Sequence, residues 1–162
     1  ILDGGFNEWK KNNFPTESKI NKFEKSEFKI EIDDTTFVDK KRVLGSMNKK
    51  NCVILNSLTE DIHNGENPRY GRPGRIPGSL NIPFHELTNL EKGCFNTPSE
   101  CLEVFNKKGI TNNSRVLNYC GGGIAASLDA FVLFQLGYND IEIYDNSMSE
   151  WATDENLPIE IG

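Results

Sequence analysis

The chain has 162 residues, with 18 Lys and Arg against 24 Asp and Glu, so its formal net charge is −6. This length suits one globular domain of ordinary size with a substantial core. The acidic balance argues against nucleic acid and anionic membrane as partners, because phosphates select for a basic face. No apolar run approaches the roughly 18–20 residues that a membrane span needs.

The cysteines and histidines, which could form a structural zinc site or disulfides, are few: Cys52, Cys94, Cys101, Cys120, His63 and His85. Their spacing fits neither a structural zinc site nor a disulfide framework. We therefore expect free thiols in a reducing, cytoplasmic compartment, with no metal and no cofactor. Cys52 lies in an apolar run and is interpreted as core. Cys94 and Cys101 are interpreted as incidental thiols, and His85 as a residue of a loop or helix start.

The two ends of the chain resemble each other. Residues 1–9 align with residues 143–151, with Ile, Asp, Glu and Trp at equivalent positions, and a proline follows each stretch. Both copies predict a short strand, a turn and a one-turn helix. Chance similarity is one interpretation. The other is that the chain begins with the last strand of one repeat and contains the whole of the next.

Between the ends, short apolar runs alternate with helical patterns. Strands are expected at residues 52–55, 79–83, 116–119 and 141–144, and helices at residues 36–49, 98–108 and 124–136. In the last helix, the apolar face is expected to contain Ile124, Leu128, Phe131, Val132 and Leu136. Residues 59–78 hold three Pro and four Gly and predict a long loop, a kind that usually serves function. The alternation predicts an α/β fold with a parallel sheet.

The strongest chemical signal is Cys120, which ends a predicted strand and is followed by Gly121, Gly122 and Gly123 before a helix. Three glycines let the backbone curl so that its N–H groups point into a concavity. The helix N-terminus adds partial positive charge, and both effects favour the nucleophilic thiolate. Open α/β sheets also place ligands at the carboxyl ends of their strands. The alternative is a structural cysteine beside a tight turn.

The residues after Cys120 restrict its chemistry. Residues 120–127 contain no Arg or Lys. This counts against a phosphatase, because such a loop needs a guanidinium to hold phosphate. A Cys–His hydrolase is also disfavoured because neither histidine is near in sequence, although such partners can meet in space. A cysteine that is assisted only by backbone N–H groups suits a persulfide, whose outer sulfur carries negative charge.

With these features the sequence resembles the rhodanese-like sulfurtransferases, especially their tandem two-domain members. The resemblance rests on residues 2–9, 72–83, 118–126 and 144–151. It implies a rhodanese-like α/β fold with a central parallel sheet flanked by helices. It also implies that residues 1–17 are the C-terminal remnant of a preceding rhodanese-like domain, residues 18–29 a linker and residues 30–162 the catalytic domain. That N-terminal domain of the same chain would be a partner.

The resemblance further implies a mechanism. Cys120 would take a sulfane sulfur from a small anionic donor, thiosulfate or 3-mercaptopyruvate, and pass it as a persulfide to cyanide or a thiol. The persulfide would be stabilised by the N–H groups of Gly121, Gly122, Gly123, Ile124 and Ala125. Arg69 would attract the donor, because members of the mercaptopyruvate type carry a Pro-Arg pair at this position. Arg72 and Arg75 are further candidates for this role.

Some positions depart from the family pattern. The family usually has an Asp-x-Arg at the end of the first core strand, and the matching residues here are Asn56, Ser57 and Leu58. The loop also lacks the cations of thiosulfate-type members, and it lacks the hydroxyls that mercaptopyruvate-type members carry where Gly122 and Ala125 stand. The sequence therefore leaves open a catalytically degenerate rhodanese-like domain that binds or regulates without turnover.

Overall fold

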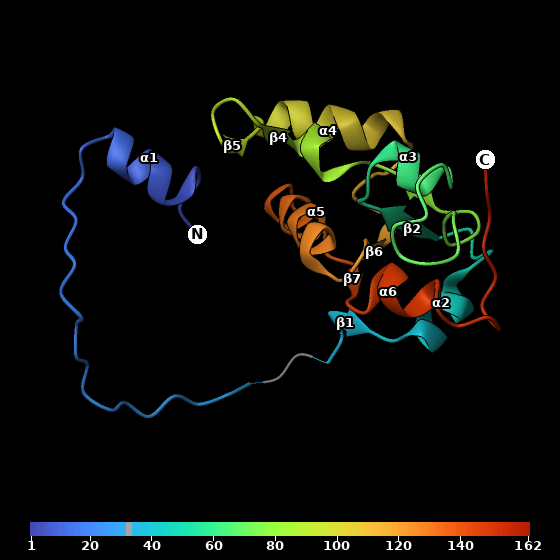
Figure 1. The fold of residues 1–162 in the computed structure, drawn as a ribbon, viewed down its shortest axis with the longest axis horizontal. Coiled ribbons are helices and arrows are strands. Elements are labelled where there is room, and N and C mark those ends of the chain that lie inside the picture. Colours follow the sequence, from blue (N-terminus) through green and yellow to red (C-terminus); the bar gives the residue numbers. More distant parts are fainter. Residues whose placement is uncertain (32–33) are drawn as a thin grey trace.

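The computed structural model describes residues 1–31 and 34–162 of the chain (Figure 1). A five-stranded sheet has the order β1-β7-β6-β2-β3, and all of its neighbouring strands are parallel. In that order the strands are Phe37–Val38, Ile141–Tyr144, Arg115–Tyr119, Cys52–Asn56 and Leu80–Asn81. The predicted α/β fold, a parallel sheet flanked by helices, is confirmed.

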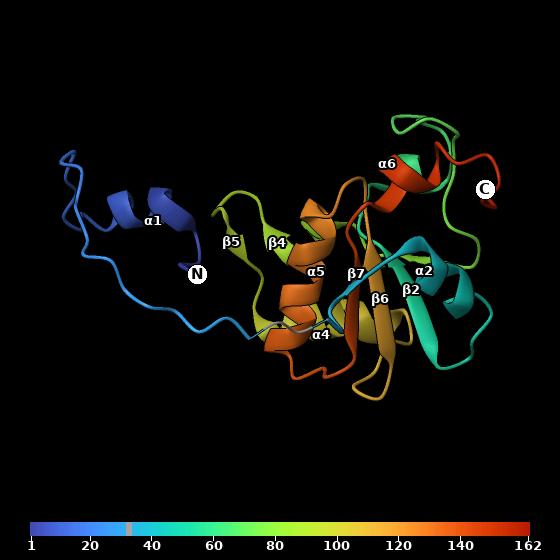
Figure 2. The ribbon, with the colours of Figure 1, turned by 90° about the horizontal axis from the view of Figure 1, so that it is seen from below.

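Six α-helices accompany the sheet in the described part of the chain: α1 (Gly5–Lys11), α2 (Lys40–Ser46), α3 (Glu60–His63), α4 (Pro98–Lys107), α5 (Ile124–Gln135) and α6 (Ser147–Trp151). Helices α4 and α5 lie on one side of the sheet, and α2 and α6 lie on the other (Figure 2). Successive side chains of a strand point to opposite faces of the sheet, so neighbouring residues belong to different hydrophobic clusters. Ile54 and Leu117 join a cluster with residues of α2 and α6, whereas Leu55 and Val116 join one with residues of α4 and α5.

The helix expected over residues 36–49 is shorter than predicted, because the first part of this segment is a strand. Phe37 and Val38 form β1, which pairs with the end of β7. Asp39 then caps α2, where its side chain accepts a hydrogen bond from the amide of Arg42 at 2.9 Å. An Asp at this position satisfies a free amide of the first turn and therefore fixes where the helix begins.

The buried face of α5 also differs from the prediction. Ile124, expected in the core, is 86% exposed, whereas Asp129 is fully buried. The helix has apolar residues on several sides, so its sequence pattern did not identify one inward face. The hairpin of β4 (Thr88–Asn89) and β5 (Cys94–Phe95) was not expected, because strands of two residues carry no periodicity.

The two similar ends of the chain share a hydrogen bond but differ in burial. In α1 the indole Nε1 of Trp9 donates to the carbonyl of Pro15 at 2.9 Å, and in α6 that of Trp151 donates to the carbonyl of Pro158 at 2.7 Å. Trp151 is fully buried, whereas α1 has no buried residue and lies apart from the sheet (Figure 1). The strand expected at the start of the first copy is not formed. The division of the chain at residues 17 and 29 stays a prediction.

Among the helices in the described part of the chain, none combines the length and apolar character that a membrane crossing requires.

Candidate active site

Cys120 follows β6 directly, at the edge of the sheet where the parallel strands β2 and β7 also end. Its amide donates a hydrogen bond to Ser147 Oγ at 3.0 Å. That hydroxyl in turn donates to the carbonyl of Tyr144 at 2.6 Å. Ser147 is fully buried, so this short relay fixes the start of the glycine loop to the end of β7.

Residues of helix α6 donate hydrogen bonds to the carbonyl groups of the glycine loop. The amide of Met148 donates to the carbonyl of Cys120 at 3.0 Å. The carbonyl of Gly121 accepts from both the amide and the hydroxyl of Ser149, at 2.9 and 2.5 Å. In a trans peptide the N–H group points opposite to the C=O group, so the amides of Gly121 and Gly122 point away from α6. Within residues 1–31 and 34–162, the amides of residues 121–123 donate to no protein acceptor.

Two of the three glycines are required by what lies against them. Gly123 has a φ of +82°, and a Cβ there would lie 2.2 Å from Asp145 Oδ1. A Cβ on Gly121 would lie 2.1 Å from the ring of Tyr70. Gly122 is different, because a Cβ there would meet only Ser149 Oγ, at 3.7 Å. A side chain would therefore not fit at Gly121 or Gly123 without a shift of its neighbours.

The Cys120 thiol is not open to solvent, because the residue is only 2% exposed and belongs to one of the two hydrophobic clusters. Tyr70, from the loop before β3, is half-buried and packs against the same cluster from outside. In the described part of the chain, Cys120 is thus followed by amides without a protein acceptor, but its own side chain is buried. A reactive cysteine needs both a favourable charge environment and access, and the sequence predicted only the first.

The comparison with protein families bears directly on this arrangement. The model described as "Rhodanese-like domain" matches residues 39–154. The chain belongs to the rhodanese-like family.

Related proteins of this family carry sulfurtransferase names. The chain is 32% identical over 155 residues to a 3-mercaptopyruvate sulfurtransferase of Mus musculus, covering 93% of this chain and 52% of that protein. It is 28% identical over 163 residues to a 3-mercaptopyruvate sulfurtransferase of Escherichia coli (strain K12), covering 99% and 57%. A putative thiosulfate sulfurtransferase of Mycobacterium bovis is 29% identical over 170 residues, covering 100% and 61%. The chain therefore spans about half the length of these curated relatives.

Solved structures support the fold. The anaerobic ergothioneine biosynthesis enzyme from Chlorobium limicola, in complex with trimethyl histidine, superposes with a TM-score of 0.91 at 22% sequence identity. That alignment covers 100% of this chain and 41% of the other. The rhodanese-like fold is confirmed.

Arg72, a predicted donor-binding residue, is engaged within the rhodanese-like domain. Its guanidinium donates to four backbone carbonyls at 2.6–3.1 Å, those of Trp151, Ala152, Asp154 and Leu157. These bonds attach the loop of residues 64–79 to the end of α6 and the turn after it. A role for Arg72 in binding the sulfur donor stays a prediction. Most N–H groups of its guanidinium already have acceptors within the protein.

Arg75 is also engaged. Its guanidinium pairs with the Glu160 carboxylate, and it donates to the carbonyl of His63 at 3.4 Å. Burial, and secondarily the Arg75 charge, lower the pKa of His63 to about 4, so this histidine is neutral near pH 7. Arg69 is exposed, and its guanidinium lies 5.7 Å from the centre of the Tyr70 ring. It is the predicted arginine that remains available near the loop.

At the end of β2 and just after it, an amide, Asn56, and an apolar side chain, Leu58, stand where the family pattern has a carboxylate and a guanidinium. Asn56 Oδ1 accepts from the amide of Leu58 at 3.0 Å, and its Nδ2 lies 3.0 Å from His63 Nδ1. Leu58 is buried in the core. No group of three or more His, Cys, Asp and Glu side chains suited to a metal ion was found among the described residues.

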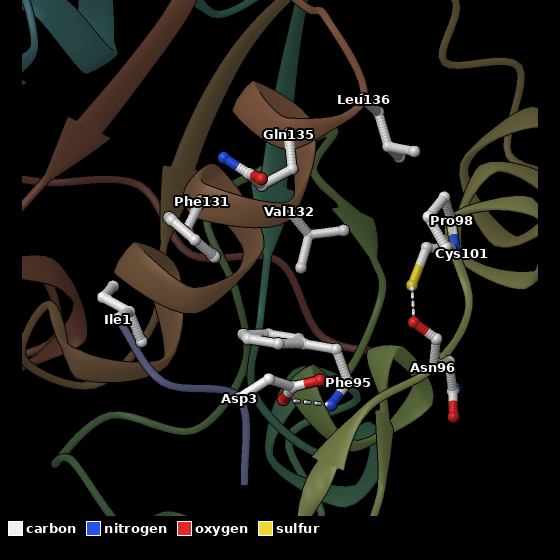
Figure 3. Close-up of a pocket in the computed structure, with 10 residues that line it drawn as sticks. All are labelled: Ile1, Asp3, Phe95, Asn96, Pro98, Cys101, Phe131, Val132, Gln135 and Leu136. Atoms are coloured by element: carbon white, nitrogen blue, oxygen red, sulfur yellow. Dashed lines mark hydrogen bonds between the residues drawn. The ribbon is translucent and has the colours of Figure 1, made fainter. Parts of the chain in front are cut away.

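A pocket of about 320 Å³ shares no lining residue with this site. Figure 3 shows the residues that line it. Ile1 and Asp3 line it together with Phe95, Phe131 and Val132, among others. The amide of Phe95 donates to Asp3 Oδ1 at 3.0 Å, which attaches the N-terminal residues to β5. The lining of this pocket includes no residue of the Cys120 loop, so we do not assign the pocket to the candidate active site.

Three residues of the site were missed by the sequence analysis: Tyr70, Ser147 and Ser149. Ser147 and Ser149 lie in the second copy of the repeat, next to the Glu and Trp that defined it. A conformational signal was present only in the structure, where Ser147 has a φ of 50°. A non-glycine residue in this region is uncommon and is often held there by its contacts.

Replacing Ser147 with alanine is expected to destabilise the domain by about 1–3 kcal/mol, because it leaves the buried Cys120 amide without its acceptor. Ser149→Ala is the matched control, since the carbonyl of Gly121 would keep its bond from the Ser149 amide. Urea unfolding of both variants measures the difference. Equal losses in the two variants would contradict the role assigned to Ser147.

Proposed function

We propose that this rhodanese-like domain is a sulfurtransferase. It moves a sulfane sulfur from thiosulfate or 3-mercaptopyruvate to cyanide or a thiol through a persulfide on Cys120. The observation that carries the proposal is the position of Cys120 at the carboxyl edge of the sheet, next to glycine amides with no protein acceptor in the described residues. Such amides stabilise a developing negative charge because they are already oriented before the reaction.

The two half-reactions balance without a cofactor. The Cys120 thiolate attacks the outer sulfur of thiosulfate, an S–S bond forms, the donor S–S bond breaks, and sulfite leaves with its electron pair. With 3-mercaptopyruvate the donor C–S bond breaks instead, the thiol proton passes to carbon, and pyruvate leaves. The acceptor then attacks the outer sulfur of the persulfide and restores the thiolate, giving ping-pong kinetics.

Residues 121–125 supply amides in this proposal, and Arg69 attracts the anionic donor. Arg69 is favoured over Arg72 and Arg75 because the guanidinium groups of those two already bind carbonyl or carboxylate oxygens of the protein. A single cation near the loop suits a monoanionic 2-oxo acid better than a dianion. We therefore rank 3-mercaptopyruvate ahead of thiosulfate.

The test is to incubate the protein with each donor and to measure the mass of the Cys120 peptide. One added sulfur atom is expected, and none is expected in the Cys120→Ser variant. Peptides with Cys52, Cys94 and Cys101 are internal controls, because nonspecific sulfuration would modify them as well. The absence of an adduct with either donor, in protein that includes its N-terminal domain, would favour a binding role.

A degenerate, binding-only rhodanese-like domain is the second candidate. Two observations favour it: the low exposure of Cys120 and the absence of a guanidinium at the end of β2. This function predicts that the Cys120→Ser variant binds the same partners as the parent protein. Measured sulfur transfer would contradict it.

We also infer that residues 1–17 belong to a preceding rhodanese-like domain of the same chain. The recurrent bond from a tryptophan indole to a proline carbonyl supports this, as does the lack of buried residues in α1. Isolated helices of such a length are marginal in water, so α1 would gain its stability from packing against that domain.

A further inference from the structure

The loop between α3 and β3 is fixed close to the Cys120 loop. Arg72 attaches it to the carbonyls of Trp151 and Ala152, at the end of α6. Gly74 lies against the chain near the C-terminus, where a Cβ would be 2.2 Å from the carbonyl oxygen of Glu160. Figure 2 shows this loop, in green, beside α6. The loop is therefore held in place on the C-terminal side of its tip.

The tip of the loop carries Tyr70. The amide of Gly71 donates to the carbonyl of Pro68 at 3.3 Å, so the chain turns tightly here. The turn directs the phenol end of Tyr70 onto the Cα of Gly121, because a Cβ on that glycine would lie 2.1 Å from both Cζ and the hydroxyl oxygen. The residue after the nucleophile is thus covered by an aromatic ring.

The burial of Cys120 is consistent with the contact between Tyr70 and Gly121. The residue is 2% exposed although it stands at an edge of the sheet, and Tyr70 packs against the cluster to which it belongs. Tyr70 itself is half-buried and its neighbour Arg69 is exposed. A partly exposed side chain on a loop tip can move at much lower free energy than the core strands beneath it.

We propose that Tyr70 determines access to Cys120, so that the site accepts small donors that present a terminal sulfur end-on and excludes bulky ones. The inference rests on the proposed function for its donor class, but the cover itself is independent of sulfur transfer. Ring atoms Cζ and Cε1 cover Gly121 together with the hydroxyl oxygen, and a phenylalanine at this position would keep the ring atoms.

The first experiment measures the alkylation rate of Cys120 by iodoacetamide and by the larger N-phenylmaleimide, with peptide mass spectrometry. Tyr70→Ala is expected to raise the rate with the larger reagent about tenfold, because a loop-tip ring is displaced at small cost. Tyr70→Phe retains the ring and is expected to react like the parent protein. Rates at Cys94 are the internal control, and Phe134→Ala, at an exposed aromatic of α5, is the control variant.

The second experiment compares persulfide formation from 3-mercaptopyruvate and from glutathione persulfide, a bulky donor. Tyr70→Ala is expected to reduce the preference for the small donor by about tenfold, for the same reason. An unchanged alkylation rate of Cys120 in Tyr70→Ala, or an equal rise in Tyr70→Phe, would overturn the proposal. Faster alkylation without a persulfide from either donor would support the cover and contradict the proposed function.

Discussion

Replacing Gly123 with alanine is expected to reduce sulfur loading of Cys120 about 100-fold or more and to destabilise the domain by about 1–3 kcal/mol. The backbone φ of +82° disfavours any side chain, and the new Cβ would lie 2.2 Å from Asp145 Oδ1 and 3.2 Å from the Asp145 carbonyl oxygen. The loop must therefore shift, and its amides would change their orientation relative to Cys120.

Gly122→Ala is the matched control for this prediction. Its Cβ would contact only Ser149 Oγ, at 3.7 Å, and the substitution keeps the amide. We expect this variant to retain most of the loading and the stability. The measurements are persulfide formation by peptide mass spectrometry and urea unfolding. Equal losses in the two variants would mean that loop geometry does not govern the chemistry.

Asp129 is expected to make the domain less stable as the pH rises. Burial raises the pKa of its carboxyl well above the ordinary value, and the nearby Ser57 hydroxyl opposes that rise. Neither carboxyl oxygen, nor Ser57 Oγ, has a hydrogen-bond partner among the described residues. The unfolded chain ionises Asp129 above about pH 3.9, whereas in the folded chain the raised pKa keeps the carboxyl protonated to a higher pH.

The sign of the effect follows from these two pKa values. Below the unfolded pKa the carboxyl is neutral in both states and folding has no ionisation cost. Between the unfolded and the raised folded pKa, the free energy of unfolding falls by about 1.4 kcal/mol per pH unit from this group. Asp129→Asn removes that slope, so its stability relative to the parent protein should increase steadily with pH.

Urea unfolding at several pH values from about 4 upward tests the prediction for Asp129. Asp34→Asn, a change at an exposed aspartate, is the control and should follow the parent protein throughout. A constant difference between Asp129→Asn and the parent protein at every pH would show that the buried carboxyl does not titrate as described.

The position of Cys120, between a strand and a glycine loop that leads into a helix, was predictable from the sequence because its signal is local. A short apolar strand, a cysteine, three glycines and a helix follow one another, and each restricts the backbone of the next. The contacts around Cys120 were not predictable in this way. Tyr70 and Ser147 reach the loop from other elements, and only the folded topology brings them together.

The errors in the fold have a similar origin. The extended residues Phe37 and Val38 resembled part of a helix because their spacing was compatible with one, and their pairing with β7 decided otherwise. In α5, apolar residues on several sides left the inward face undetermined, and tertiary packing buried Asp129 while exposing Ile124. The structure of short strands, and the inward face of a helix with apolar residues on several sides, are decided by packing partners rather than by their own periodicity.

The five-residue helix α6 touches both walls of the site. Its first turn binds the carbonyls of Cys120 and Gly121, and the carbonyls of Trp151 and Ala152 at its end bind Arg72. The helix therefore connects the Cys120 loop to the loop that carries Arg72 and Tyr70. The cysteine loop of a relative could be grafted onto this domain in a chimera. We expect the chimera to show the cysteine reactivity of that relative only when α6 is exchanged together with the loop.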